Sequence, residues 1–403
     1  MLTLKLGFRN IFRNKRRTIF TLLSMIVSFL LASVSIGWSD GSYGNIIDKF
    51  TRNIMGHIQI HNKSYVDNPS LYKTIDNPDK IIKVLKEDNR IENWSMRVYA
   101  SGLGAGEEKS AGIRITGVDF KREDKVFHFG NKIVKGKIPE NNKEVSIGKG
   151  LAKILRMKVG DSIVVLSQAA DGSIANDRYK VVSIIDSGDE IIDRMSVYMN
   201  IDEARELFVL DNRIHEIAVV LKDRNDVDIV KNSLNKKIND KSVLVEKWQE
   251  FAKEFYRAMK ADQAGMWYTL FIIILIVAIT ILNTVLMSVL ERTREFGLLK
   301  ALGTKPSKIV KMVIVEVLIL SFIAIIIGSI LSFGANSFLE THGYKIPEPF
   351  TYGGVKFEYM KGEVNLRTFV IPMITVIVSA FIVGIIPAIR ASKIEPAKSM
   401  RFH

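Results

Sequence analysis

Four long apolar stretches dominate the alternation of hydrophobic and polar positions along this chain. They lie near residues 18–38, 266–290, 312–333 and 369–389. Each is long enough for a helix to cross a bilayer core, which takes about 20 mostly apolar residues. The pattern therefore predicts an α-helical membrane protein whose four transmembrane helices occupy residues 18–40, 263–290, 312–338 and 368–389.

The first apolar stretch has an alternative interpretation as a cleavable signal peptide. Arg13, Lys15 and Arg16 precede it, and small residues such as Ala32 follow. The stretch is longer than the usual apolar core of a signal peptide, and Trp38 suits an interfacial anchor. We therefore favour a membrane span.

The polar segment between the first two stretches, residues 41–262, predicts a large α+β domain inserted between helices one and two. Short runs that alternate or cluster like strands intermix with helical patterns. The expected strands are 57–60, 98–100, 112–118, 162–166, 179–185 and 217–221. The expected helices are 79–86, 150–155, 202–207 and 226–235.

Two amphipathic patterns flank the spans. Residues 246–262 place Trp248, Phe255 and Met259 on one helical face, which predicts a stalk helix leading into span two. A hinge near Gly265 is the alternative. Residues 1–17 predict an elbow helix on the inner leaflet, with a frayed basic tail as the alternative.

The distribution of basic residues predicts the orientation in the membrane. The net charge is +14, and basic clusters lie before span one, between spans two and three, and after span four. Lys and Arg favour the cytoplasmic side, so both termini, residues 291–311 and the tail 390–403 are expected there. Residues 41–262 and the short loop 339–367 are then expected outside. The charge accompanies no nucleic-acid recognition motif, so we expect no nucleic-acid partner.

Enzyme signatures are missing from the sequence. There is no Cys, and the sequence contains no HExxH or GxSxG. The glycine-rich run 102–106 resembles a phosphate-binding loop, but Glu108 precedes Lys109 where such a loop needs Gly, so a hairpin tip is favoured. His57 and His61 are a weak metal pair at best. We expect a non-enzymatic chain without catalytic residue, metal or cofactor of its own.

The block between spans two and three carries the stronger signal. Span two is expected to continue into the cytoplasm as a charged helix that Gly303 ends, and Pro306 suits the first turn of a new short helix. Glu316, inside span three, is expected to form an ion pair or to serve a function. The helix extension comprises Glu291, Arg292, Arg294, Glu295 and Gly303. The expected docking element, with an ordinary basic loop as the alternative, comprises Lys305, Pro306, Ser307, Lys308, Ile309, Val310 and Lys311.

Three groups of residues carry a resemblance to a known family. They are Arg9-Asn10 with Arg16-Arg17-Thr18, the block from Asn283 to Glu316 including 300–303, and the ending Pro387 to Ala397. Together they resemble the MacB-like, or FtsX-like (type VII), ABC transporter permeases. The resemblance implies pairing with a second permease subunit, as a homodimer or heterodimer, and with two copies of a cytoplasmic ABC ATPase that binds ATP and Mg. It also implies that ATP-driven motion is transmitted to the outer domain (mechanotransmission), with residues 305–311 as the coupling helix.

Within that family the chain looks most like the lipoprotein-releasing permeases, which implies the inner membrane of a bacterium, lipoprotein cargo and a periplasmic carrier. An efflux permease for a drug or peptide, and a signalling scaffold that activates a cell-wall hydrolase, are the alternatives. The expected acyl-chain cavity, with simple contact to membrane lipid as the alternative, is lined by Val34, Ser35, Trp38, Met266, Trp267 and Leu270. The expected carrier-recruiting loop contains Gln168, Asp171, Gly172, Asn176, Asp177 and Arg178.

Overall fold

The structure is a computed structural model that describes residues 15–352 and 355–395. The expected elbow helix, 1–17, lies largely outside these residues, as does most of the tail, 390–403. The chain divides into two compact units. A helical unit contains Met1–Tyr43, Met259–Lys345 and Tyr359–His403, and an α+β unit contains Gly44–Ala258 and Ile346–Glu358.

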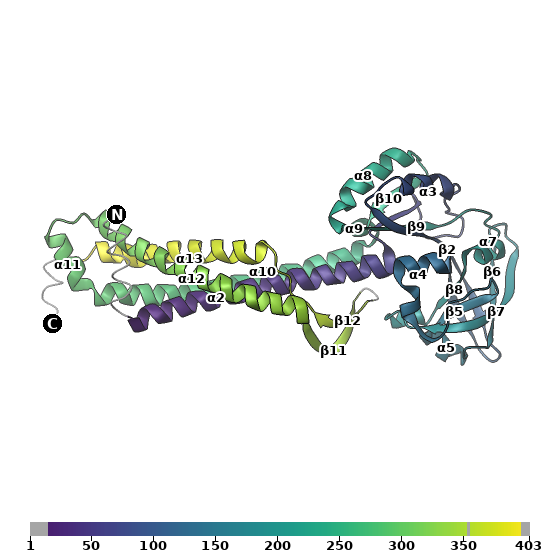
Figure 1. Ribbon diagram of the computed structural model, residues 1–403, viewed down its shortest axis with the longest axis horizontal. Coiled ribbons are helices and arrows are strands. Elements are labelled where there is room, and N and C mark those ends of the chain that lie inside the picture. Colours follow the sequence, from purple (N-terminus) through teal and green to yellow (C-terminus); the bar gives the residue numbers. More distant parts are fainter. Residues whose placement is uncertain (1–14, 353–354, 396–403) are drawn as a thin grey trace. The chain divides into compact units, whose positions relative to one another are not determined.

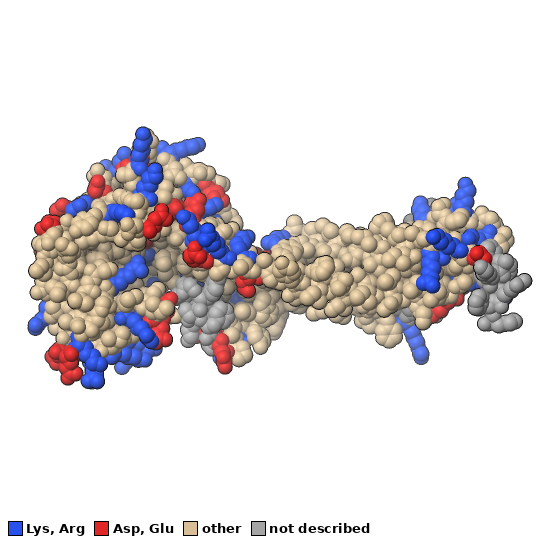
Figure 2. Space-filling view, turned by 180° about the vertical axis from the view of Figure 1, so that it is seen from behind, with Lys and Arg blue, Asp and Glu red and all other residues tan. Residues whose placement is uncertain are grey.

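Long helices build the helical unit (Figure 1). They are α2 (Lys15–Phe50), α10 (Lys253–Glu291), α12 (Pro306–His342) and α13 (Arg367–Ser392), with the shorter α11 (Thr293–Ala301) between α10 and α12. In the described part of the chain, four helices are long and apolar enough to cross a membrane. Large apolar side chains remain exposed along them, for example Phe271 at 63% and Ile330 at 68%. Figure 2 shows a surface of this unit that is nearly free of charge except toward its ends.

The core of the helical unit joins all four long helices. Met25 of α2, Ile281 of α10, Val317 of α12 and Ala380 of α13 belong to one buried cluster. Helices α2 and α12 approach closely at Gly37, where an added Cβ would lie 2.3 Å from Oδ1 of Asn336. Small residues allow this approach, as is common between membrane helices.

Helix α12 differs from the expectation of a separate short helix at residues 306–311. Lys305 is its N-cap and Pro306 its first residue, as Pro306 predicted, but the helix then continues without a break through Lys311 into the apolar span. No Gly or Pro lies between Lys311 and Gly328 to end it. The separate short helix is instead α11, which ends before Gly303 (φ +83°).

A mixed ten-stranded sheet forms the centre of the α+β unit. Its strand order is β10-β1-β9-β2-β3-β8-β5-β7-β4, and β6 pairs with β2 and β7. Pairs β3–β8 and β5–β7 are parallel, and the other pairs are antiparallel. The strands are β1 (Ile58–Asn62), β2 (Ile91–Ala105), β3 (Ser110–Val118), β4 (Ile133–Gly136), β5 (Glu144–Gly148), β6 (Ser162–Gln168), β7 (Ile174–Ile185), β8 (Ser196–Asn200), β9 (Glu216–Leu221) and β10 (Val243–Lys247).

Short helices cover this sheet, and one large buried cluster of apolar residues runs between helices and strands. In α8, Val230 and Leu234 are four residues apart and both are buried, which is the spacing of one helical face. The helices are α3 (Pro78–Lys86), α4 (Phe120–Phe127), α5 (Lys149–Leu155), α6 (Glu190–Asp193), α7 (Ile201–Leu207), α8 (Val227–Ile238) and α9 (Trp248–Phe251), with 3-10 turns η2 (Phe129–Lys132) and η3 (Arg224–Asp226).

A π-helical turn, η1 (Thr51–Met55), follows α2 and enters β1. The N–H of Gly56 donates to the carbonyl of Thr51 at 2.8 Å, the five-residue spacing of a π-turn. The carbonyls of Asn53 and Ile54 in this turn accept hydrogen bonds from side chains of η2 and β2, respectively.

Each of the six strands and four helices expected between residues 57 and 235 overlaps an observed element. The expected helix 246–262 is wrong at its start, because Glu246 and Lys247 pair with β1 as part of β10. The helical turn α9 follows, the chain breaks at Ala252, and α10 continues through Gly265 without a hinge there. Residues 339–367, expected as a loop, contain the strands β11 (Tyr344–Tyr352) and β12 (Val355–Met360).

Candidate docking surface, hairpin and cleft

The turn between α11 and α12 presents an exposed apolar and basic surface. Leu298 and Leu302 are 54% and 76% exposed, and Lys305 and Lys308 are exposed beside them in the sequence. Ile309, by contrast, is 1% exposed and belongs to the core of the helical unit. The exposed apolar residues of this turn are therefore Leu298 and Leu302 at the end of α11, and not Ile309.

Ion pairs of Arg292 and hydrogen bonds of Lys300 fix the position of this turn. Arg292 donates to Glu316 at 2.9 Å and to Glu295 at 3.1 Å, and its guanidinium also lies over the ring of Phe296. The expected ion pair of Glu316 is therefore present. Lys300 donates to the carbonyls of Ser392 and Ile394 at 3.0 and 2.8 Å, which attaches α11 to the end of α13.

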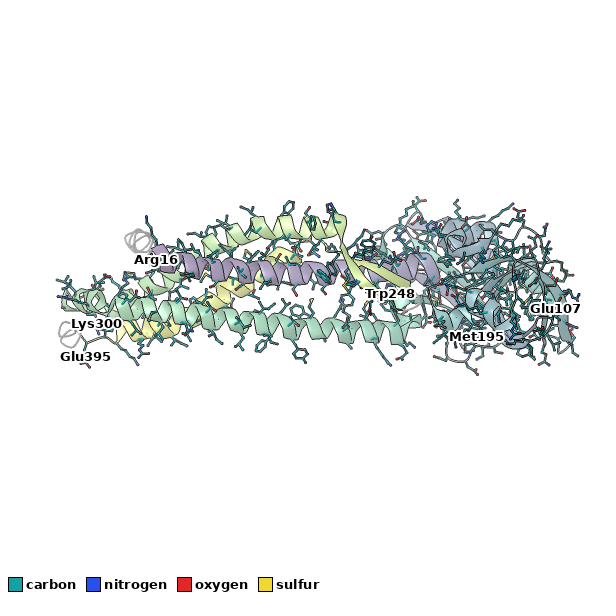
Figure 3. All side chains as sticks on the ribbon, turned by 90° about the horizontal axis from the view of Figure 1, so that it is seen from below. Arg16, Glu107, Met195, Trp248, Lys300 and Glu395 are labelled. Atoms are coloured by element: carbon teal, nitrogen blue, oxygen red, sulfur yellow. The ribbon has the colours of Figure 1, made fainter. Side chains whose placement is uncertain are left out.

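Three segments with basic residues meet at one end of the helical unit. Figure 3 shows Arg16 at the start of α2, Lys300 in α11 and Glu395 after α13 at the same end. From their basic residues, we expect these three segments on one side of the membrane.

Only part of the expected lining of an acyl-chain cavity lies at a recorded contact between α2 and α10. Met266 and the buried Leu270 contact a cluster with Ala32 and Ile36. Trp267 is half exposed. Trp38 lies against Tyr344, with 5.7 Å between ring centroids, and Val34 and Ser35 are partly buried. Leu270 is thus covered by its own chain, whereas Trp267 is available to lipid or a ligand.

The expected carrier-recruiting loop is a tight hairpin between β6 and β7. Asp171 accepts hydrogen bonds from the N–H and hydroxyl of Ser173, and these bonds lower the pKa of the Asp171 carboxyl. Gly172 has φ +88°, which a glycine adopts without strain. Next to this polar tip, Ile174 is 79% exposed. Of the six expected residues, Gln168, Asn176, Asp177 and Arg178 lie in the strands, and only Asp171 and Gly172 lie in the turn.

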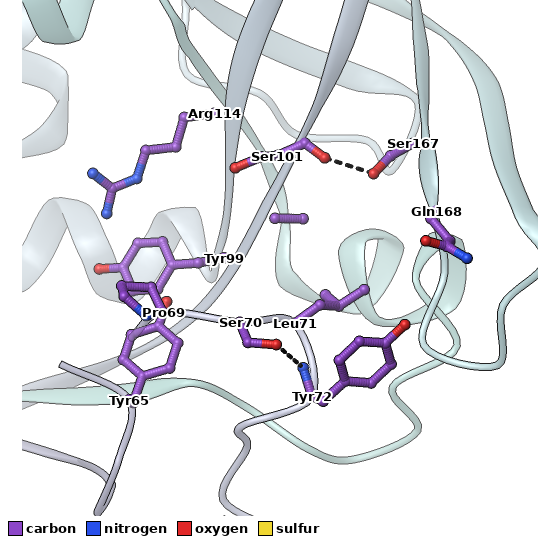
Figure 4. Close-up of a pocket in the computed structure, with 11 residues that line it drawn as sticks. Tyr65, Pro69, Ser70, Leu71, Tyr72, Tyr99, Ser101, Arg114, Ser167 and Gln168 are labelled. Carbon is purple, nitrogen blue, oxygen red and sulfur yellow. Dashed lines mark hydrogen bonds between the residues drawn. The ribbon is translucent and has the colours of Figure 1, made fainter. Parts of the chain in front are cut away.

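A cleft of about 650 Å³ opens beside this hairpin (Figure 4). The rings of Tyr65 and Tyr99 stack with 6.3 Å between centroids, and the guanidinium of Arg114 lies 5.0 Å from the Tyr99 ring. Burial raises the pKa of Tyr65, which stays neutral at any physiological pH. The lining comprises Tyr65, Pro69, Ser70, Leu71, Tyr72, Tyr99, Ala100, Ser101, Arg114, Ser167 and Gln168.

A buried group of charged residues lies behind the π-helical turn. Arg97 donates to Glu123 at 2.7 Å and to Glu216 at 3.3 Å, and the three side chains are 4–8% exposed. Arg97 also donates to the carbonyl of Ile54 at 2.8 Å, and Lys132 donates to that of Asn53 at 2.9 Å. Burial lowers the pKa of Lys132 to about 8 and raises that of Glu216. The sequence does not distinguish these residues from ordinary surface charges.

Comparison with known proteins identifies the protein family to which the chain belongs. A family model described as "MacB-like periplasmic core domain" matches residues 18–237, and one described as "FtsX-like permease C-terminal" matches residues 267–396. The first alone covers more than half of the chain. The protein is a multi-span membrane permease, and it belongs to the MacB/FtsX-like family of ABC transporter permeases.

Relatives include the lipoprotein-releasing system transmembrane protein LolC of Neisseria meningitidis, which is 22% identical over 74% of both chains. LolE of Haemophilus influenzae is 23% identical over 82% of both chains. The ABC transporter permease YtrF of Bacillus subtilis is 32% identical over 38% of this chain and 34% of its own. Among solved structures, the periplasmic region of MacB from Actinobacillus actinomycetemcomitans matches 49% of this chain and 92% of its own, at 14% identity and a TM-score of 0.38.

Proposed function

We propose that this chain is the permease subunit of a mechanotransmission ABC transporter that releases lipoproteins from the outer leaflet of the inner membrane to a periplasmic carrier. Hydrolysis of ATP by a separate partner ATPase supplies the energy. The observation that carries the proposal is the match to lipoprotein-releasing relatives over 74–82% of both chains, which includes residues from both structural units.

The orientation follows from the basic end of the helical unit. The segments around Arg16, Lys308 and Arg390 carry an excess of basic residues, which favours the cytoplasm. The α+β unit is then periplasmic. Because the chain has no Cys, single cysteines introduced at Lys308 and at Asp171 give a direct test. In intact cells, a membrane-impermeant maleimide should label the second position and spare the first; the reverse pattern would reject this orientation.

The ATPase docks, in this proposal, on the surface formed by Leu298, Leu302, Lys305 and Lys308. An exposed apolar centre with a basic rim suits a protein interface. The pairs Arg292–Glu316 and Lys300–Ser392 connect that surface to α12 and α13, so displacement of the turn moves both helices. This is how a soluble motor acts on the membrane helices.

The test is a double variant, Leu302→Asp with Lys308→Glu, reconstituted with the cognate ATPase and permease partner. We expect loss of ATPase stimulation and of lipoprotein release, with the thermal midpoint of the permease unchanged because both side chains are exposed. Leu366→Asp is the matched control, since Leu366 is 77% exposed at the N-cap of α13. Normal ATPase stimulation and lipoprotein release in the double variant would refute the proposed docking surface. An equal loss of both activities in the control would show that the effect is not specific to this surface.

Cargo contact is proposed at the exposed part of the α2–α10 region, around Trp267 and Trp38. A photo-reactive phenylalanine analogue at position 267 should cross-link a triacylated lipoprotein in a nanodisc. The same analogue at Phe333, which is 57% exposed on α12, is the control. Cross-linking of a lipid-embedded drug instead of lipoprotein at position 267 would favour an efflux permease.

A further inference from the structure

The central strand β2 has a gap in its pairing along one edge. On that edge, β2 pairs with β9 as far as Arg97 and with β6 only from Leu103 onward. Residues 98–102 therefore have no strand partner there in the described part of the chain, although β3 pairs with all of them on the opposite edge. Tyr99, Ala100 and Ser101 of the gap line the cleft of about 650 Å³ (Figure 4).

Along this gap, two main-chain groups of β2 form hydrogen bonds with side chains instead of with a neighbouring strand. Nδ1 of His215 accepts from the N–H of Tyr99 at 3.1 Å, and the hydroxyl of Ser167 donates to the carbonyl of Ser101 at 2.6 Å. A serine hydroxyl rotates freely, so it can release the carbonyl of Ser101 to an incoming N–H. His215 is fixed by a second contact, of its Nε2 with the carbonyl of Leu71 at 3.1 Å. The edge is thus open to main-chain pairing at Ser101.

The cleft favours a negative group. Its described lining contains Arg114 and no Asp or Glu. The nearby carboxylate of Glu216 is buried and pairs with Arg97, and no carboxylate of the described residues lies within ion-pair distance of the Arg114 guanidinium. Arg114 is exposed, while its guanidinium is held over Tyr99. An arginine placed in this way presents donors to a carboxylate at little cost in side-chain entropy.

We propose that this cleft binds an extended peptide segment that carries a carboxylate, added as a short strand beside residues 98–101. Leu166 and Ser167 of β6 already lie against Gly102, so the free edge comprises residues 98–101 and accommodates about four strand residues, or roughly 13 Å. Main-chain hydrogen bonds to Ser101 supply affinity, and the ion pair with Arg114 selects an acidic side chain. The exposed ring of Tyr72 covers the segment from the loop side.

A sugar ring fits this cleft poorly. Sugar rings pack on open aromatic faces, but here the faces of Tyr65 and Tyr99 lie against each other, and Arg114 lies over Tyr99. An acyl chain is also a poor fit, because three serines, a glutamine and an arginine contribute to the lining. The ring edges and backbone that remain available suit a polypeptide.

The test uses the full chain in lipid nanodiscs and a blocked pentapeptide, acetyl-Thr-Val-Glu-Val-Thr-amide, with binding measured by saturation-transfer NMR and calorimetry. Replacing the peptide's Glu by Gln should weaken binding at least about ten-fold, the usual effect of losing a charged hydrogen bond. Arg114→Gln should weaken binding of the Glu peptide equally and should make the two peptides equivalent. N-methylation of alternate peptide amides should abolish binding.

Arg122→Gln is the matched control, since the guanidinium of Arg122 lies 4.9 Å from the ring of Trp94, outside the cleft. It should leave the affinity unchanged. If Arg114→Gln does not fold, Tyr72→Ala, at an exposed position, should still reduce binding. A photo-reactive form of the peptide should cross-link to residues 65–72 or 98–102.

Equal affinity for the Glu and Gln peptides, undiminished binding after N-methylation, or cross-links elsewhere would each overturn the proposal. So would binding of a chitin tetrasaccharide in place of the peptide. The inference is independent of lipoprotein release, because the peptide assay requires neither ATPase nor cargo.

Discussion

Replacing Arg97 by methionine tests whether the charged group behind the π-helical turn stabilises the α+β unit. Methionine keeps much of the length of the side chain but removes the donors to Glu123, Glu216 and the carbonyl of Ile54. Two nearly buried carboxylates then lack their common cation. Removing one partner from a buried ion pair costs roughly 3–5 kcal/mol. For a unit of about 200 residues, this corresponds to a fall of roughly 6–20 °C in the unfolding midpoint.

The assay is thermal unfolding of the full chain in detergent, combined with hydrogen exchange read on peptides from β2 and α4. The control is Arg194→Met, because the pair of Arg194 with Glu190 is 59% and 78% exposed and an exposed pair contributes at most about 1 kcal/mol. The triple variant Arg97→Met, Glu123→Gln, Glu216→Gln should recover most of the loss, because it leaves no unpaired buried charge.

The pH dependence of this variant has a defined sign. Burial already raises the pKa of Glu216 above its value in the unfolded chain, so protonation of Glu216 favours the folded state as the pH falls. Without Arg97, the folded state favours protonated Glu216 more strongly. The loss of unfolding free energy caused by Arg97→Met should therefore be smaller at pH 5 than at pH 7.5. A deficit below about 1 kcal/mol at pH 7.5, or one independent of pH, would refute the reasoning.

Two further predictions concern packing and pH. Gly37→Val should lower the thermal midpoint of the helical unit in detergent by several degrees, because an added Cβ overlaps Asn336, whereas Gly334→Val on α12 should not, because open space surrounds Gly334; equal effects of the two would contradict the close approach. Burial lowers the pKa of His57 and His215 to about 4, so the unfolded chain takes up protons first as the pH falls. Each should therefore contribute roughly 3 kcal/mol of stability that is present above about pH 6.5 and lost toward pH 4. The denaturant midpoint should be lower at pH 4.5 than at pH 7, and His57→Gln should reduce this difference. Identical midpoints of the wild-type chain at the two pH values would argue against a contribution of these histidines.

Much of the fold follows from local patterns in the sequence. The four long helices come from apolar runs, and β3, β7 and β9 come from short apolar or alternating runs bounded by polar residues. Pro306 correctly predicts the start of α12. The expected end of the helix at Lys311 comes from the change from charged to apolar residues there, but a change in polarity does not end a helix, and no helix-breaking residue lies at this point.

Long-range contacts explain the remainder. Glu246 and Lys247 look helical, but pairing with β1, almost 190 residues earlier, places them in a strand. Ile309 looks exposed among lysines, yet contacts within the helical unit bury it. The tyrosine cleft combines residues 65–72, 99–101, 114 and 167–168, which no local pattern connects. Secondary structure is thus predictable here, whereas the surfaces that distant segments build together are not.

The π-helical turn Thr51–Met55 has a mechanical consequence. Its outward carbonyls bind Arg97 and Lys132, while Arg52 donates to the carbonyls of Leu221 and Lys222, so bonds to several strands and loops hold this turn. A force or torque applied to residues 44–50 therefore loads all of these hydrogen bonds together and not one after another. The turn thus resists torque as a single body, because no one of these bonds has to carry the load alone.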